Sequence, residues 1–205
     1  MAQDLGKIEK PEVKDFKKGR KLYLIPLIFA GENLPPDYVQ IYDLYWKQVP
    51  EHMRNLENKI GCCMHVYHES VSESGEDGLK SLEGLHKQSH IIVKEVCGRG
   101  ACFEALEDKE LLEETLDWQR CLIMGFMSQK VADKVSQFYI EAAKERYKHM
   151  EKSIHNTLQA DEAAALFINE RHMIQFPADI EVFRVAPPAL DEIYKWLRDR
   201  QNLPQ

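Results

Sequence analysis

The sequence has no apolar run long enough to cross a membrane. A spanning helix needs roughly 20 consecutive apolar residues, whereas the first strong apolar run, KLYLIPLIFA, covers only residues 21–30. The N-terminal segment MAQDLGKIEKPEVKDFKKGRK is charged and has no apolar core, so it does not resemble a signal peptide. We therefore expect a cytoplasmic protein with no membrane partner.

Cysteine is scarce and lacks the spacing of a zinc site. Cys62 and Cys63 are adjacent, and Cys97 and Cys102 are five positions apart, so no C-x2-C pair is formed. The total of five is odd, and disulfide frameworks are rare in cytosolic proteins. Free buried thiols that pack as small apolar groups are the expected state. No local signature of a nucleophilic cysteine is present.

An excess of basic residues is absent as well. The 27 Lys and Arg are outnumbered by 34 Asp and Glu, which gives a net charge of −7. The only basic run, residues 14–21, is short, so the chain lacks the clustered basic face of a nucleic-acid-binding domain. With 44% hydrophobic and 30% charged residues, the composition is that of a soluble globular protein. We expect no nucleic-acid partner.

One stretch, from Cys62 to Glu95, organises the predicted fold. Its first part, CCMHVYHE, is typical of a strand, and SESGEDGLKSLEGLHK of a short helix. The run HIIVKEV, residues 90–96, has the near-continuous apolar core of a strand that is buried on both faces. The stretch therefore predicts a strand, a crossover helix and a second strand.

The rest of the chain continues the alternation of strands and helices. Apolar, β-rich runs predict strands at 21–30, 164–169 and 180–186, and helical periodicity is found at 38–60, 102–158 and 187–200. Pro26 suggests that the first strand lies at an edge or has a bulge, and Pro50 that its helix is broken or kinked. We expect an α/β fold in which about five strands form a mostly parallel or mixed sheet with helices on both faces. Residues 1–20 would be a flexible arm, and 21–205 a single domain with a helical insertion at about 102–158.

Histidines and carboxylates are concentrated near the predicted strand ends. In an open α/β sheet, ligands bind outside the carboxyl ends of the strands. Such residues could bind a divalent metal ion, or provide a general base and its orienting partner. Because His65 and His68 are three positions apart, a regular strand would direct them to opposite faces. The clusters are His65/His68/Glu69, Glu95, Glu145-Arg146 and Glu170/Arg171/His172.

The order of these pieces resembles the TraB/PrgY and TIKI superfamily, which includes erythromycin-esterase and ChaN-like proteins. The matching pieces are His68, IIVKE ending in Glu95, ERYKHMEKSI beginning at Glu145-Arg146, and LFINERH ending in His172, so the resemblance covers roughly residues 65–186. It implies a hydrolase-like or metal-binding site built from His and Glu, because TIKI members are metal-dependent proteases. The chain differs from the family in that its first histidine follows Val-Tyr rather than Gly-Thr, and its last follows Asn-Glu-Arg rather than glycines.

Two classes of function follow from these observations. In the first, the protein is a hydrolase that acts on a small molecule or a peptide through activation of water. His68, Glu95 and His172 would then be bases or ligands of a divalent metal ion, and Arg146 would hold an anionic group. In the second, the protein is a non-catalytic domain that binds a partner, forms a homo-oligomer or senses a small ligand. The long helices at 38–60 and 102–158, with Tyr42, Tyr45, Trp46 and Met127, would supply the contact surface.

Structural roles are the alternative for each candidate residue. His68 and Glu69 could satisfy backbone groups at the end of a strand, and Glu95 could pair with Arg99 or Arg120. Glu145-Arg146 could lie on a solvated helix face, and His172 in a turn.

Overall fold

The computed structural model describes residues 18–31 and 34–201. Most of the predicted N-terminal arm therefore lies outside the described residues. Within them, no helix has the length and apolar character needed to span a membrane. The helices and strands, in chain order, are β1 (Arg20–Pro26), α1 (Pro36–Ile60), β2 (Cys63–His68), α2 (Gly75–Leu85), α3 (Lys87–Gly98), β3 (Cys102–Phe103), α4 (Lys109–Met124), α5 (Gln129–Thr157), β4 (Ala163–Ile168), β5 (Ile180–Arg184) and α6 (Pro188–Gln201).

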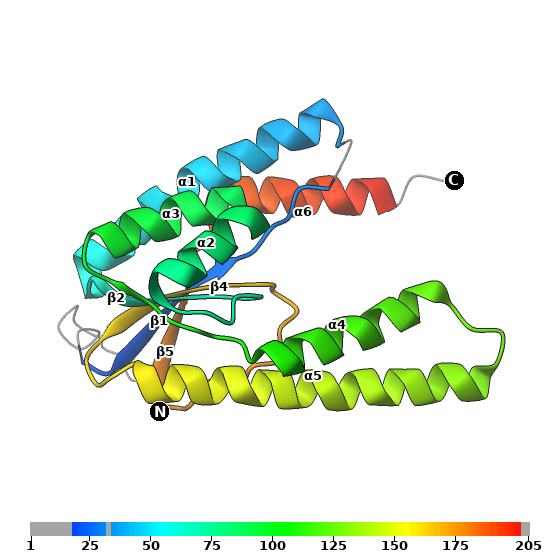
Figure 1. The fold of residues 1–205 in the computed structure, drawn as a ribbon. Coiled ribbons are helices and arrows are strands. Elements are labelled where there is room, and N and C mark those ends of the chain that lie inside the picture. Colours follow the sequence, from blue (N-terminus) through cyan, green and yellow to red (C-terminus); the bar gives the residue numbers. More distant parts are fainter. Residues whose placement is uncertain (1–17, 32–33, 202–205) are drawn as a thin grey trace, which may run out of the picture.

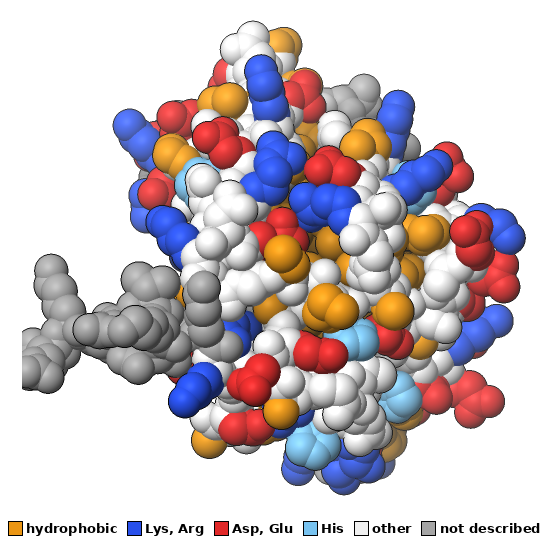
Figure 2. All heavy atoms as spheres, turned by 90° about the vertical axis from the view of Figure 1, so that its left-hand side faces the viewer, with side chains coloured by type: hydrophobic (Ala, Val, Ile, Leu, Met, Phe, Trp, Pro, Cys, Tyr) orange, Lys and Arg blue, Asp and Glu red, His pale blue; other side chains and the backbone are white. Residues whose placement is uncertain are grey.

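The strands form one five-stranded sheet in the order β3-β2-β4-β1-β5, and every neighbouring pair is parallel. Because parallel neighbours cannot be joined by a tight hairpin, the chain must cross over a face of the sheet between strands. All five strands therefore end at the same edge, which we call the carboxyl edge. The opposite edge, where the strands begin, faces the viewer in Figure 2, and acidic and basic side chains are interspersed on it.

Helices cover both faces of the sheet (Figure 1). Side chains alternate along β1, so that Tyr23 and Ile25 pack with α1, α2, α3 and α6, whereas Leu22 and Leu24 pack with α5 on the other face. The same alternation in β4 divides its six buried residues between the two cores. The prediction of an α/β fold with helices on both faces is thus confirmed.

The predicted strand at residues 90–96 is wrong, because this segment belongs to α3. A short apolar run fits a buried strand and one face of a helix equally well. Here Ile92, Val93 and Val96 face the core, while Ile91 and Glu95 are exposed. The helix begins after His86, whose ring nitrogen accepts a hydrogen bond from the Ser89 amide at 3.1 Å. The fifth strand is instead the two-residue β3.

The edge position expected from Pro26 and the helix break expected from Pro50 are not found. β1 lies between β4 and β5 rather than at an edge, and Pro26 is its last residue. Pro50 lies inside α1, which runs without a break from Pro36 to Ile60. Proline at the end of a strand removes no donor from the middle of the ladder, so an interior strand tolerates it there.

Helices α4 and α5 pack against each other and fill most of the predicted helical insertion. Only the second half of α5, from Ala142 to Ile154, contributes buried residues, and Thr115 is the only buried residue of α4. The first half of α5 and most of α4 extend beyond the carboxyl edge of the sheet (Figure 1). α6 lies on the other side of that edge, so the two helical layers flank it.

Candidate functional site

A buried cluster of ionic side chains lies at the carboxyl ends of β2 and β3. Arg146 on α5 donates from Nε to Glu107 at 2.9 Å, and its Nη2 bonds both Glu107 and, at 3.4 Å, Glu69. None of the three residues is more than 8% exposed. Paired hydrogen bonds between a guanidinium and a carboxylate are among the strongest in proteins. The cluster, called here the buried ion cluster, therefore fixes α5 to two strand ends.

Both carboxylates of the buried ion cluster also hold backbone. Glu69 accepts a hydrogen bond from the Asn169 amide at 2.7 Å, just after β4 ends, and Glu107 accepts one from the Ser70 amide at 2.9 Å. Ser70 has a φ of 70°, a left-handed conformation that costs energy for a residue other than glycine. The cluster thus sets the paths of the chain as it leaves β2 and β4.

Burial raises the pKa of Glu69, although the Asn169 amide and Arg146 act in the opposite direction. Burial alone would lower the pKa of Arg146, but the hydrogen bond and charge of Glu107, together with the charge of Glu69, raise it overall. The guanidinium is therefore held as a cation. Glu69 is a carboxylate whose proton affinity is increased, which is a common property of residues in acid–base sites.

His68 faces away from the buried ion cluster. Its ring is completely buried, with Nδ1 2.5 Å from the Glu69 carbonyl oxygen and Nε2 2.9 Å from Ser89 Oγ on α3. Burial lowers its pKa to about 3, so the ring is neutral near pH 7. His68 therefore satisfies backbone at a strand end, as its alternative interpretation predicted, and both ring nitrogens are occupied. His65 lies beside Tyr67 on the opposite face of β2 from His68, which agrees with the odd separation of the two histidines.

Glu95 does not lie at the carboxyl edge. It is half exposed near the C-terminal end of α3, where it pairs with Arg54 at 3.3 Å and Arg99 at 3.8 Å. The helix leads from Ser89, beside His68, toward the start of β3, so Glu95 is near the opposite edge of the sheet. Its predicted position beside His68 depended on the strand at 90–96 and is wrong with it. The pairing with Arg99 was the structural alternative.

His172 lies in the segment that joins β4 to β5. Its amide bonds the Asn169 carbonyl oxygen at 3.1 Å in a turn, and its ring packs edge-on against Phe176. The Nδ1 atom is buried and has no hydrogen-bond partner among the described residues. Burial lowers the pKa of His172, so the imidazole is neutral at pH 7. The Asn169 backbone contacts both the His172 amide and the Glu69 carboxylate, so it links this turn to the buried ion cluster.

The four predicted site residues are therefore only partly brought together. Arg146 and His172 both lie near the carboxyl edge, whereas His68 faces the other core and Glu95 the other edge. Across the described parts of the chain, no group of three or more His, Cys, Asp or Glu side chains is arranged to hold a metal ion. The residues present do not fit the metal centre that the resemblance implies.

A pocket of about 420 Å³ opens at the carboxyl ends of β1 and β4. We call it the edge pocket. Its two arginines, Arg171 and Arg198, are exposed and form no ion pair within the described part of the chain. Glu170 is already engaged, because Arg184 and the Tyr194 hydroxyl both donate to it. The pocket is lined by Leu27, Ile28, Asn169, Glu170, Arg171, Tyr194, Leu197 and Arg198.

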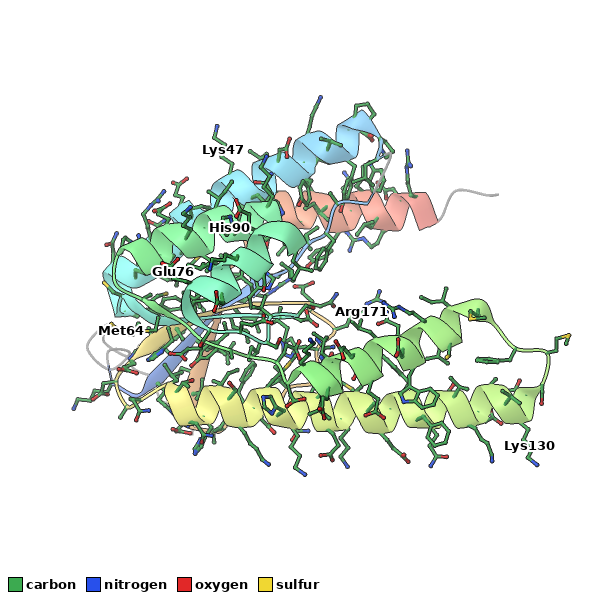
Figure 3. The ribbon with its side chains drawn as sticks, in the orientation of Figure 1. Lys47, Met64, Glu76, His90, Lys130 and Arg171 are labelled. Carbon is green, nitrogen blue, oxygen red and sulfur yellow. The ribbon has the colours of Figure 1, made fainter. Side chains whose placement is uncertain are left out.

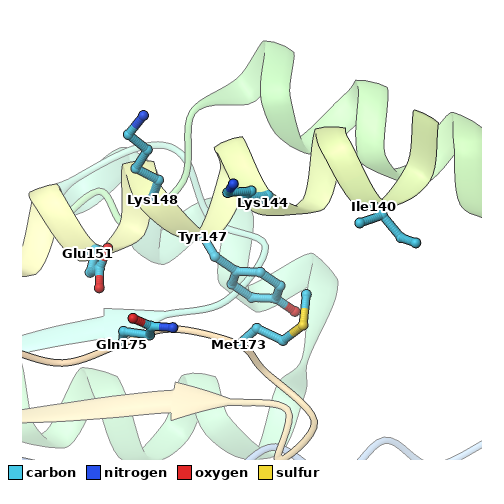
Figure 4. Close-up of a pocket in the computed structure, with 7 residues that line it drawn as sticks. All are labelled: Ile140, Lys144, Tyr147, Lys148, Glu151, Met173 and Gln175. Carbon is cyan, nitrogen blue, oxygen red and sulfur yellow. The ribbon is translucent and has the colours of Figure 1, made fainter. Parts of the chain in front are cut away.

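A second pocket, of about 470 Å³, lies between α5 and the β4–β5 segment (Figure 4). Tyr147 points from α5 toward Met173, while Lys148 points away from that contact. Its lining is formed by Ile140, Lys144, Tyr147, Lys148, Glu151, Met173 and Gln175. We call it the α5 pocket. Arg171 lines the edge pocket and Met173 lines the α5 pocket, so the same short segment borders both.

Sequence reasoning missed two parts of this site. Glu107 was missed because β3, the strand that precedes it, has only two residues. These are too few to show the alternating pattern by which a strand and its end are recognised. Arg198 was missed because it lies far along α6, and only the fold brings it to the carboxyl edge. The signal available for Glu107 was local: Asp108 caps α4 by accepting from the Leu111 amide, so a chain turn was predictable there.

Comparisons with known proteins add no relative: no family model, no curated protein and no solved structure matches this chain. The resemblance to the TraB/PrgY and TIKI superfamily therefore remains a prediction from the sequence.

Proposed function

We propose that this protein binds a small anionic molecule in the edge pocket. The observation that carries the proposal is the place of that pocket: it lies between two neighbouring strands whose chains leave the sheet toward opposite faces. After β1 the chain continues into α1 on one face. After β4 it continues through residues 169–179, where Ile174 and Phe176 pack on the other face. Ligands of open α/β sheets bind in such crevices.

The charges of the edge pocket favour an anion. Arg171 and Arg198 present two guanidinium groups, which match carboxylate and phosphate oxygens in geometry. Glu170 would oppose an anion, but its carboxylate is occupied by Arg184 and Tyr194. Leu27, Ile28 and Leu197 add apolar surface for the rest of a ligand. The volume of about 420 Å³ is within the usual range for small-molecule sites.

A thermal-shift experiment tests this proposal. The probes are inorganic phosphate, citrate and ADP, added separately to the full chain, to an Arg171→Ala/Arg198→Ala variant and to an Arg54→Ala control. Arg54 is also an exposed arginine, but it pairs with Glu95 near the other edge. We expect at least one anion to raise the melting temperature of the wild type and the control, but not of the double variant. The same rise in all three proteins would contradict the proposal.

A second candidate, hydrolysis, is favoured by His172. His172 directly follows Arg171, which lines the edge pocket. Its imidazole is neutral, and its buried Nδ1 atom has no hydrogen-bond partner in the described residues. A neutral imidazole can take a proton from water as that water attacks a bound ester or amide. We assign this role of general base to His172, with the two arginines holding an anionic substrate. Because the residues do not fit a metal centre, no step is assigned to a metal ion.

Chromogenic carboxylic and phosphoric esters, and an unstructured peptide, are suitable substrates for a test. We expect His172→Gln to lower any hydrolysis by about 100-fold or more, the usual contribution of a general base. His52→Gln, on α1, is the matched control and should retain the full rate. Equal rates for wild type and His172→Gln would rule out the base while leaving anion binding to be judged separately.

A further inference from the structure

Arg171, one of the two arginines of the edge pocket, lies just after β4 and extends beyond the carboxyl edge (Figure 3). Its backbone amide donates to Oδ1 of Asn169 at 2.9 Å. This is an Asx turn, in which an asparagine side chain takes the place of a backbone acceptor and fixes the path of the next two residues. The His172 amide also donates to Asn169, at the carbonyl oxygen and 3.1 Å. The place of the Arg171 backbone therefore depends on Asn169.

Asn169 is held in turn by Glu69 of the buried ion cluster. The Asn169 amide donates to Glu69 Oε2 at 2.7 Å, across 100 positions of the sequence. Glu69 is itself buried, and its own amide donates to the Phe167 carbonyl oxygen at 2.9 Å, which ties its backbone to β4. Its second oxygen, Oε1, accepts from Arg146 at 3.4 Å. A short chain of hydrogen bonds thus leads from the buried ion cluster through Asn169 to the backbone of Arg171.

We propose that Glu69 is a positioning residue for anion binding: through Asn169 it holds Arg171 at the separation from Arg198 that one anion requires. This role rests on the proposed function, because it concerns the same pocket. Two guanidinium groups bind one carboxylate or phosphate together only when both are correctly placed, and a site that is ordered beforehand loses less entropy on binding. Arg198 has a separate support, because it lies on α6, which packs on α1.

The position of Glu69 requires a carboxylate rather than an amide. Both of its oxygens accept, Oε2 from the Asn169 amide and Oε1 from the Arg146 guanidinium. A glutamine has one accepting oxygen and one NH₂ group, so Glu69→Gln can satisfy only one of these donors at nearly unchanged volume. The guanidinium repels the NH₂ group, so we expect the bond to Asn169 to be lost. Glu69→Met is a second variant, because it has no accepting oxygen whichever way it turns, while Arg146 keeps its bonds to Glu107.

Amide hydrogen exchange of the ligand-free chain, followed by NMR, tests the positioning by itself. In both Glu69 variants the amides of Asn169, Arg171 and His172 should exchange several-fold faster than in the wild type, because their hydrogen bonds open more often. Unchanged exchange at these three amides in both variants would overturn the proposal.

Glu107→Gln is the matched control for this experiment. Glu107 belongs to the same buried ion cluster and also pairs with Arg146, but the backbone amide that it holds is that of Ser70. Its loss should therefore speed exchange at Ser70 and leave exchange at residues 169–172 as in the wild type. An equal rise at residues 169–172 in the control would overturn the specific role of Glu69.

A double-mutant cycle in anion affinity separates positioning from a general loss of stability. Phosphate, citrate and ADP are titrated separately into the wild type, Glu69→Gln, Arg171→Ala and the combined variant. Glu69→Gln should weaken binding roughly 2- to 30-fold, the range for residues that act on a site through their neighbours. Where Arg171 is already absent, it should have no further effect. An equal loss in both backgrounds would overturn the proposal, because Glu69 would then act on the whole fold.

The two readouts distinguish a failure of the positioning role from a failure of the proposed function. If no anion binds the wild type while exchange at residues 169–172 depends on Glu69, the proposed function is wrong, and the role in binding falls with it. If an anion binds through Arg171 and Glu69→Gln leaves its affinity unchanged, the edge pocket stands and only the role of Glu69 is overturned.

Discussion

Arginine and glutamate pair at both edges of the sheet, but in opposite environments. Near the edge where β2 and β3 begin, Arg54 and Arg99 pair with Glu95, and all three side chains are about half exposed. At the carboxyl edge, Arg146 pairs with Glu69 and Glu107, and all three are buried. Exposed ion pairs contribute about 0–1 kcal/mol to stability, whereas a buried charge left without its partner is costly. The same two residue types thus mark a solvated surface at one edge and a candidate site at the other.

The largest expected effect is the loss of Arg146. Arg146→Met would leave two carboxylates buried beside each other, so the free energy of unfolding should fall by about 3–5 kcal/mol. Arg54→Met removes an exposed arginine that pairs with the half-exposed Glu95 and should cost less than about 1 kcal/mol. Equilibrium urea denaturation of both variants measures the two values. Similar losses of unfolding free energy in the two variants would show that burial does not make the ion pairs at one edge more important than those at the other.

The adjacent residues His68 and Glu69 allow a sharper comparison through pH. The pKa of His68 is lowered by burial to about 3, below the value of 6.5 for an exposed histidine. Between those values the unfolded chain binds more protons than the folded one, so stability falls as the pH falls. From pH 7 to pH 5 this residue should cost about 2 kcal/mol of unfolding free energy.

The test is the pH dependence of stability in His68→Gln. As the pH falls, its unfolding free energy should fall less steeply than that of the wild type. The two slopes should differ by the equivalent of up to about one proton taken up per molecule on unfolding. His86 and His172, whose pKa values partial or full burial also lowers, keep the remaining slope. The change in slope is the readout, because the substitution can also lower stability at every pH. An unchanged slope would mean that the pKa of His68 is the same in the folded and the unfolded chain.

A smaller effect is expected where burial is intermediate. Tyr194 is partly buried and donates a hydrogen bond to Glu170, whose side chain is 29% exposed and also pairs with the half-exposed Arg184. Tyr194→Phe should cost about 1–2 kcal/mol, as for one hydrogen bond to a charged group. It should also weaken binding of an anion, because Glu170 becomes free to approach Arg171. Calorimetric unfolding and titration of the variant measure both effects. Tighter binding in Tyr194→Phe would contradict the assigned role of Glu170.

Much of the fold was predictable because its strands are short, apolar and bounded by clear breaks. Four predicted strands, at 21–30, 62–69, 164–169 and 180–186, overlap β1, β2, β4 and β5. The segment 90–96 failed because its apolar run satisfies a helix that buries Ile92, Val93 and Val96 on one side. Without an independent signal for the helix start at His86, the two interpretations could not be separated.

The candidate site was less predictable, because it depends on which face each strand end turns toward. The sequence places His68 and Glu69 at a strand end, but a one-residue difference sends them to different cores. A register shift between Cys63 and His65 adds to this uncertainty. Arg146 lies on a helix that is exposed in one half and buried in the other. Its partner Glu107 follows a strand too short to be recognised.

The most direct test of the proposed function is a titration followed by ¹H–¹⁵N NMR of the full chain. The probe is whichever of phosphate, citrate or ADP stabilises it most. We expect the amide signals of residues 27–28, 169–171 and 194–198 to move together as the probe is added, and to stay still in Arg171→Ala/Arg198→Ala. Shifts confined to the α5 pocket, around Lys144 and Lys148, or no shifts at all, would contradict anion binding in the edge pocket.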